Sequence, residues 1–149
     1  MIELKNVTIR YKGQEHDSLS DVSLNVKDGE CILLCGKSGC GKTTVTRLLN
    51  GMIPEFYSGE IQGKIAVSGI DPTQEPMYAL SKHVGTVFQN PRTQFYTVDT
   101  TSEIAFGCEN RGMPPAIIRQ KVADAAEKMN LTALLDQNIF HLSKNMVQQ

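Results

Sequence analysis

Near the start of the chain, apolar and polar residues alternate in two stretches, which predicts a pair of β-strands. The apolar positions change face midway through residues 2–11, so we expect a strand with a bulge near Asn6. Residues 22–26 alternate cleanly and end at Lys27-Asp28-Gly29, which is typical of a tight turn. The opening of the chain therefore predicts an antiparallel arrangement.

Apolar residues follow one another without interruption in 31–35 and 84–88. Such short runs are typical of strands that are buried on both faces. Cys31 and Cys35 would then lie on one side of the first strand and pack in the core as small hydrophobic residues. Residues 61–67 predict one further strand.

Helical spacing appears in residues 45–51, where Gly51 stands at a typical helix end. A longer helix is predicted over 115–129, with Pro115 in its first turn. We expect a short helix to begin at Ser102 and one or two helical turns over 77–82. On the helix over 115–129 the predicted buried face consists of Ile118, Val122, Ala125 and Met129.

The composition is that of an ordinary water-soluble domain, with 149 residues, 40% hydrophobic residues and a net charge of −1. That charge gives no basic surface for nucleic acid. The N-terminal residues lack the pattern of a secretory leader, so a cytoplasmic protein is expected. Cysteines at positions 31, 35, 40 and 108 do not have the spacing of a zinc site.

Residues 36–43 match the pattern G-x-x-x-x-G-K-[ST] between a predicted strand and a predicted helix. Glycines at 36, 39 and 41 allow backbone N–H groups to approach phosphate oxygens at a helix N-terminus. Lys42 is suited to the β- and γ-phosphates, and the Thr43 hydroxyl to Mg²⁺. Cys40 is either a small residue that fits the loop or a redox-sensitive thiol. The predicted nucleotide-binding residues of the loop are Gly36, Lys37, Ser38, Gly39, Cys40, Gly41, Lys42, Thr43 and Thr44.

Several separated features resemble the ATP-binding-cassette (ABC) ATPases. Tyr11 precedes the loop as does the aromatic residue that stacks on adenine in that family. The run 21–30 resembles the family's approach to the loop. Gln89 matches the glutamine that reaches Mg²⁺ and the attacking water, and Leu142-Ser143 stands where the family's signature L-S-G-G-Q begins. The resemblance covers residues 2–143.

A narrower resemblance is carried by Gln89-Asn-Pro-Arg-Thr-Gln94 and by the run from Glu103 to Gly112. These residues are similar to the ATPase subunits of energy-coupling-factor importers for metal ions and vitamins. That resemblance implies ATP and Mg²⁺ as cofactors, with Lys42 and Gln89 in catalysis and Thr43 and Gln89 at the metal. It also implies a transmembrane transporter subunit that contacts residues 90–110, and a second ATP-binding subunit in a homo- or heterodimer. The chain would then lie at the inner face of the membrane.

The implied fold is an α/β P-loop NTPase (ABC ATPase) core that is incomplete at its C-terminal side. Residues 1–30 would form an antiparallel β part, 31–99 the phosphate-loop core, and 100–149 the start of a helical part. Strands that flank 31–35 in the family would be missing, so we expect an exposed apolar edge there and an isolated chain that is poorly soluble or partly unfolded. The implied function is coupling of ATP binding and hydrolysis to import.

Agreement with the family stops after Ser143, where Lys144 and Asn145 replace the two glycines of the signature. The family's metal-binding aspartate, catalytic glutamate and switch histidine have no counterpart, and none of the three histidines is assigned that role. A frameshift or early stop near position 143 would explain both the loss of agreement with the signature and the absence of the later family residues. Divergent function is the alternative. The rival functions are a nucleotide-binding module without turnover and, less favoured by the antiparallel opening, a small kinase.

Overall fold

The computed structural model describes residues 1–142. Contacts divide the chain into two compact units, Met1–Thr86 and Val87–Gln149. The signature residues predicted from Ser143 onward lie outside the described residues.

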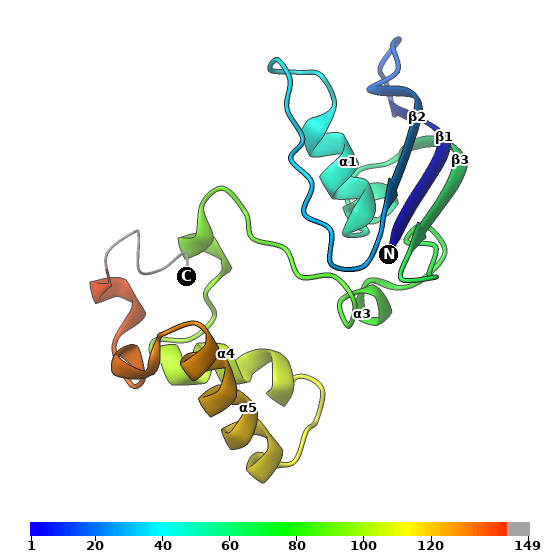
Figure 1. Cartoon of the computed structure of the whole chain (residues 1–149). Helices are drawn as coiled ribbons and strands as arrows, with labels where there is room; N and C mark the ends of the chain where they lie inside the picture. The colour runs from blue at the N-terminus through cyan, green and yellow to red at the C-terminus, as the bar shows by residue number, and fades with distance from the viewer. Residues whose placement is uncertain (143–149) are drawn as a thin grey trace. The chain divides into compact units, whose positions relative to one another are not determined.

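The first unit is built on a three-stranded antiparallel sheet (Figure 1). Its strands are β1 (Ile2–Tyr11), β2 (Leu19–Val26) and β3 (Gly59–Val67), in the order β2-β1-β3. The pairing shifts register after Leu4 on one side of β1 and after Lys5 on the other, and Asn6 has a φ of 50°. The bulge predicted near Asn6 and the antiparallel opening are therefore confirmed.

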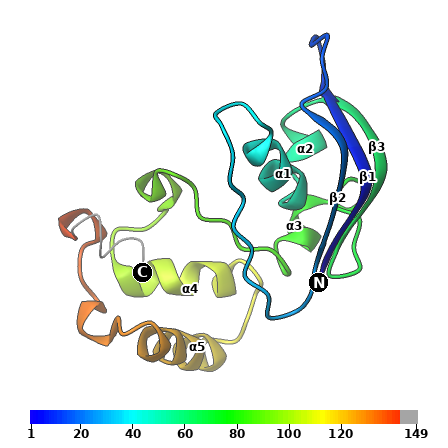
Figure 2. The ribbon, with the colours of Figure 1, turned by 45° about the horizontal axis from the view of Figure 1, so that its top comes forward.

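Three helices belong to the same unit: α1 (Lys42–Leu49), α2 (Met52–Glu55) and α3 (Met77–Leu80). In Figures 1 and 2, α1 and α2 lie against one face of the sheet. Leu48 of α1 is fully buried, and Gly51 follows the helix with a φ of 78°, as predicted. The sheet, α1 and α2 enclose one core, whose buried residues are Leu4, Val7, Ile9, Leu19, Val45, Leu48, Ile53 and Ile65.

The predictions of buried strands over 31–35 and 84–88 are wrong for the described residues. Neither segment is a strand, and both cysteines of the first are exposed instead of packing in the core. Leu33 is 84% exposed and Val87 is 77% exposed. An apolar run becomes a buried strand only beside neighbouring strands, and no described strand pairs with either segment. Residues 31–35 are exposed, as expected, but as a segment outside any strand and not as the edge of a sheet.

The second unit is helical over its described residues, with α4 (Thr100–Glu109) and α5 (Pro115–Lys128) side by side (Figure 2). Short 3₁₀ turns flank them: η1 (Pro91–Gln94), η2 (Thr132–Leu134) and η3 (Ile139–His141). No helix described in either unit is both long and apolar enough to cross a membrane.

Local sequence explains both long helices of this unit. Asp99 caps α4 by accepting a hydrogen bond from the Ser102 backbone N–H, so α4 begins slightly before the predicted start at Ser102. Pro115 stands in the first turn of α5, as predicted. On α5 Val122 is buried, but Met129 is 49% exposed, because the helix ends at Lys128 and Ala126 takes the buried position in its last turn.

Candidate functional site

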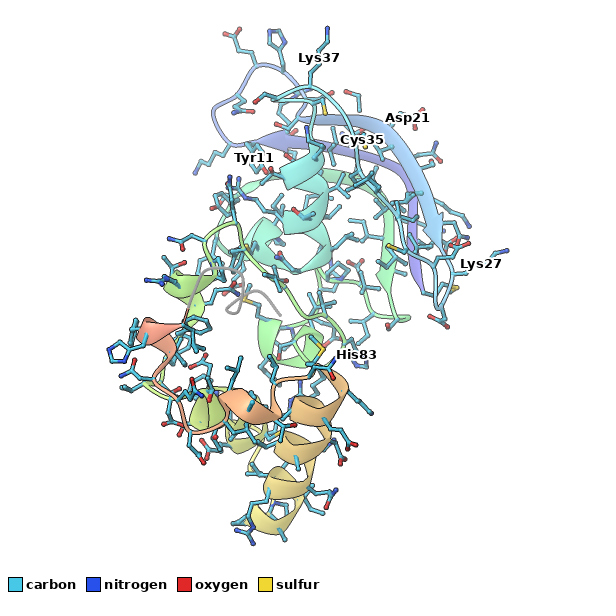
Figure 3. The ribbon with its side chains drawn as sticks, turned by 60° about the vertical axis from the view of Figure 1, so that its left-hand side comes forward. Tyr11, Asp21, Lys27, Cys35, Lys37 and His83 are labelled. Carbon is cyan, nitrogen blue, oxygen red and sulfur yellow. The ribbon has the colours of Figure 1, made fainter. Side chains whose placement is uncertain are left out.

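Three glycines give the loop before α1 its shape. Gly36, Gly39 and Gly41 have φ values of 154°, 81° and 90°, all in the region that disfavours other residues. A Cβ at Gly41 would lie 2.8 Å from the Ser18 carbonyl oxygen, so this end of the loop packs directly on the start of β2. The loop is exposed over residues 36–40. Labelled residues Cys35 and Lys37 mark it in Figure 3.

Lys42 folds back over this loop. Its Nζ donates to the carbonyl oxygen of Gly36 at 2.9 Å and of Lys37 at 2.7 Å, and it lies 3.4 Å from the Cys40 Sγ. The ammonium group is therefore already held at the centre of the loop by weak neutral acceptors. A phosphate oxygen entering there would offer it a charged acceptor, which forms the stronger hydrogen bond.

The N-terminus of α1 opens onto the loop. Gly41 is its N-cap residue, no side chain caps it, and its first turn holds no acidic residue. Helix N-termini of this kind favour an anion through unpaired N–H groups and the helix dipole. Thr43 is exposed in this turn, whereas Thr44 is buried. The arrangement therefore fits the phosphate groups of a nucleotide.

Tyr11 lies beside the same helix turn (Figure 3). Its hydroxyl donates to the Thr44 Oγ1 at 3.2 Å, and its half-buried ring packs against the core. Tyr57 contacts this ring edge to face, with centroids 6.3 Å apart, and the Arg47 guanidinium carbon lies 4.0 Å from the Tyr57 ring centroid. Sequence reasoning missed Tyr57 and Arg47, because only the pairing of β1 with β3 brings Tyr57 next to Tyr11.

Gln89 belongs to the second unit, whereas the phosphate loop belongs to the first. The joint role of Thr43 and Gln89 at Mg²⁺ therefore stays a prediction. Gln89 itself is exposed, and the turn that follows it is closed by Gln94, whose Oε1 accepts the Phe88 backbone N–H at 2.9 Å. The second glutamine of the sequence pattern thus shapes the loop that carries the first.

Glu103 fixes the end of this loop, a role that sequence reasoning did not assign. Its Oε2 accepts the backbone N–H of Thr97 at 2.9 Å, the Thr97 hydroxyl at 2.8 Å and the backbone N–H of Tyr96 at 3.1 Å. The Tyr96 ring is 78% exposed and stacks on Phe106 of α4, with centroids 5.0 Å apart. The segment therefore presents the Tyr96 ring to solvent, held in place by the half-buried Phe106.

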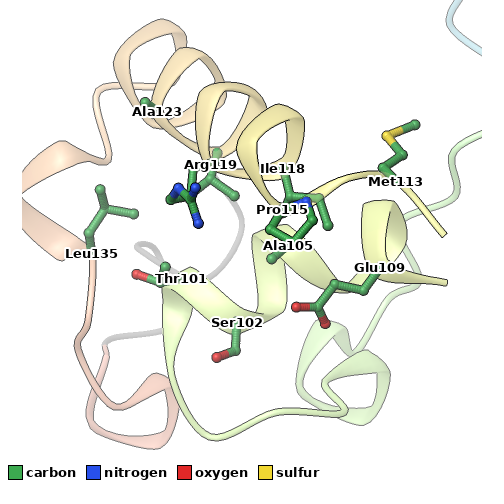
Figure 4. Close-up of a pocket in the computed structure, with 11 residues that line it drawn as sticks. Thr101, Ser102, Ala105, Glu109, Met113, Pro115, Ile118, Arg119, Ala123 and Leu135 are labelled. Atoms are coloured by element: carbon green, nitrogen blue, oxygen red, sulfur yellow. The ribbon is translucent and has the colours of Figure 1, made fainter. Parts of the chain in front are cut away.

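A groove of about 600 Å³ lies between α4 and α5 (Figure 4). Its lining is mostly apolar, with Glu109 contributed by α4 and Arg119 by α5. It shares α4 with the segment predicted to contact a transmembrane partner. In residues 1–142 no cluster of three or more histidine, cysteine, aspartate or glutamate side chains has the geometry to hold a metal ion.

Comparison with known proteins gives one consistent result. The sequence profile of the ABC transporter family matches residues 19–149. A Treponema denticola protein described as an ABC transporter ATP-binding protein is 48% identical over 143 residues, which are 96% of this chain and 29% of that protein. A Methanosarcina acetivorans protein with the same description is 41% identical over 142 residues and is covered to 23%. The chain thus spans less than a third of the length of these relatives.

Solved structures agree on the fold. The structure of cbiO1 from Clostridium perfringens, described as part of the ABC transporter complex cbiONQ, matches with a TM-score of 0.85 and 25% identity. It aligns with 99% of this chain, which covers 57% of cbiO1. A bacterial ABC transporter cassette solved as a dimer matches with a TM-score of 0.74. The profile match, the two relatives and the shared fold together show that this chain belongs to the ABC transporter family and forms part of its ATP-binding domain.

Proposed function

We propose that the chain is the nucleotide-binding part of an ATP-binding subunit in an importer of the energy-coupling-factor class, which takes up a metal ion or a vitamin. The observation that carries the proposal is the loop in which Lys42 and three glycines with positive φ meet an uncapped helix N-terminus. The importer class is supported by the patterns at 89–94 and 103–112 and by the likeness to cbiO1.

Four of the predicted site residues would have distinct parts in this function. Lys42 would exchange the carbonyl oxygens of Gly36 and Lys37 for the β- and γ-phosphate oxygens of ATP. Tyr11 would stack on the adenine, as the family resemblance implies. Thr43 and Gln89 would hold Mg²⁺, which offsets the charge of the phosphates during in-line attack by water. The protein's share of the catalysis is then positioning and charge stabilisation.

The proposed transporter contains two further kinds of subunit. A second ATP-binding subunit would close on the nucleotide, and a transmembrane subunit would contact residues 90–110 from the inner face of the membrane. The exposed Tyr96 ring, stacked on the half-buried Phe106, supports a partner surface in this segment. Aromatic residues are enriched in protein interfaces relative to the rest of the surface.

A nucleotide-binding module without turnover is the second candidate. It is favoured by one observation on the printed sequence: residues 1–149 contain no residue that we assign to polarise the attacking water. Binding and hydrolysis therefore need separate measurements.

The test is calorimetric titration of the 149-residue chain with MgATP, followed by a steady-state phosphate-release assay. Lys42→Ala removes charge-assisted hydrogen bonds, so its affinity for MgATP should fall about ten- to one-hundred-fold. Lys64→Ala, which removes the same charge from the exposed side of β3, should bind within about two-fold of wild type.

Equal affinities of the two variants would overturn nucleotide binding at this loop. We expect no phosphate release above that of Lys42→Ala. Phosphate release that requires Lys42 would instead show that this chain hydrolyses ATP, and it would exclude the module without turnover.

A further inference from the structure

Beside the phosphate loop lies an aromatic cluster that no sequence motif identifies. It runs from Arg47 in the last turn of α1 through Tyr57 to Tyr11 and ends at Thr44 in the first turn of α1. Both ends of the cluster thus lie on the helix whose N-terminus faces the loop. Arg47, Tyr57 and Tyr11 are all half-buried.

Backbone pairing fixes where Tyr57 stands. Gly59 of β3 pairs with Tyr11 of β1, and the Lys12 backbone N–H donates to the Ser58 carbonyl oxygen at 2.9 Å. A Cβ at Gly59 would lie 2.5 Å from the Arg10 carbonyl oxygen, so only glycine allows β3 and β1 to approach this closely here. The Tyr57 backbone is therefore tied to the backbone of Tyr11.

Side-chain contacts then fix the Tyr11 ring. The two tyrosine rings meet at 65°, which is the edge-to-face geometry that aromatic pairs favour. The Arg47 guanidinium lies over the Tyr57 ring and is attracted to its π-face. At the other end the Tyr11 hydroxyl donates to Thr44. A ring held by a neighbouring ring and at its hydroxyl needs little further ordering when a base stacks on it.

We propose that Tyr57 and Arg47 are positioning residues of the nucleotide site: they hold the Tyr11 ring in the plane in which it stacks on the base of a nucleoside triphosphate. This inference rests on the proposed function, in which the loop binds the phosphates. In this role Tyr57 and Arg47 act only through Tyr11 and would contact neither phosphate nor metal. Their loss should weaken binding of a nucleotide and leave binding of a bare polyphosphate unchanged.

Two ligands separate these roles in the full 149-residue chain, namely MgATP and magnesium tripolyphosphate. Tyr57→Leu and Arg47→Met should each weaken MgATP binding about three- to ten-fold, while tripolyphosphate affinity stays within about two-fold. Tyr57→Phe keeps the ring and should bind MgATP like wild type. Tyr78→Leu is the matched control, because Tyr78 is 72% exposed in the same unit.

Each result decides the inference. Wild-type MgATP affinity in Tyr57→Leu would overturn it, and so would a parallel loss of both ligands, which indicates damage to the fold. The proposed function is tested independently of this inference: it fails if Lys42→Ala leaves the affinity for both ligands unchanged. A wild-type chain that binds neither ligand overturns both proposals.

Tyrosine fluorescence gives a second readout, because the chain has four tyrosines and no tryptophan. In a variant that carries Tyr57→Phe, Tyr78→Phe and Tyr96→Phe, only Tyr11 emits. ATP should quench this emission and tripolyphosphate should not, because only ATP brings a base to the ring. Equal quenching by both ligands would contradict stacking on Tyr11.

Discussion

Alanine at Gly41 should damage the first unit more than alanine at Gly39, although both glycines lie in one loop. Their φ values are similar, 90° and 81°, so each substitution costs about 1–2 kcal/mol of backbone strain. Each also removes the same freedom from the unfolded chain, and that contribution cancels in the comparison. The two sites differ mainly in the space that surrounds the added methyl group; Gly41 is also the N-cap residue of α1, where alanine is disfavoured, which adds to the difference in the same direction.

Around Gly39 nothing lies within 4 Å of the added Cβ, whereas at Gly41 it would meet the Leu19 Cδ2 at 2.5 Å and the Ser18 carbonyl oxygen at 2.8 Å. That carbonyl cannot retreat easily, because the Ser18 backbone N–H is hydrogen-bonded to the Ile9 carbonyl oxygen of β1 at 2.7 Å. Overpacking of this kind costs about 1–3 kcal/mol. The difference in unfolding free energy between the variants should therefore be about 1–3 kcal/mol.

The assay is equilibrium unfolding in urea without nucleotide, followed by tyrosine fluorescence. Tyr11, Tyr57 and Tyr78 lie in Met1–Thr86, so the signal reports mainly on the first unit. With a slope of about 1–3 kcal/mol per molar urea, the midpoint of Gly41→Ala should lie roughly 1 M below that of Gly39→Ala. Coincident midpoints would refute the claim that the loop packs on the start of β2.

Three further predictions follow from burial and hydrogen bonding. Leu48→Ala empties a fully buried position and should lower the unfolding free energy by about 2–5 kcal/mol, whereas Leu33→Ala, at an 84% exposed position, should change it by less than about 0.5 kcal/mol in the same urea assay. The pKa of Asp99 is lowered from its ordinary value by the hydrogen bond from the Ser102 backbone N–H and, second, by that from the Ser102 hydroxyl. The stabilisation of α4 by the Asp99 carboxylate is therefore complete above the ordinary pKa and is lost as pH falls through the lowered pKa. Circular dichroism during an acid titration should show this loss of helix in wild type and not in Asp99→Ala. Glu103→Ala should speed amide hydrogen exchange at the two backbone N–H groups that the carboxylate accepts, and unchanged protection there would contradict its role in fixing the loop.

The sequence predicts well those elements whose signals are local. The bulge near Asn6 follows from a change of apolar face within β1, and Pro115 marks the start of α5 by its fixed φ. Gly51 ends α1 because the chain must turn with a positive φ there. Each of these signals acts over a few neighbouring residues of one helix or strand, so the prediction needs no knowledge of distant partners.

Long-range contacts account for what the sequence could not predict. An apolar run such as 31–35 indicates that burial of the segment would be favourable, but it does not show which strand would cover it, and the described residues hold none. Tyr57 carries no signal at all, because its contact with Tyr11 depends on a register that shifts between Lys5 and Thr8. A prediction from local sequence patterns therefore finds the loop before α1 but misses residues such as Tyr57 that pack beside it.

The phosphate loop keeps its shape although the segment before it is not a strand. Its C-terminal end is held by Gly41 against Ser18, and its N-terminal end is held by hydrogen bonds from Lys42 to the carbonyl oxygens of Gly36 and Lys37. Helix α1, which carries Lys42, is anchored in turn by the burial of Leu48 against the sheet. The geometry of the proposed phosphate site therefore depends on how α1 packs on the antiparallel sheet. None of these contacts involves residues 31–35, so the shape of the loop does not depend on pairing of that segment with a strand.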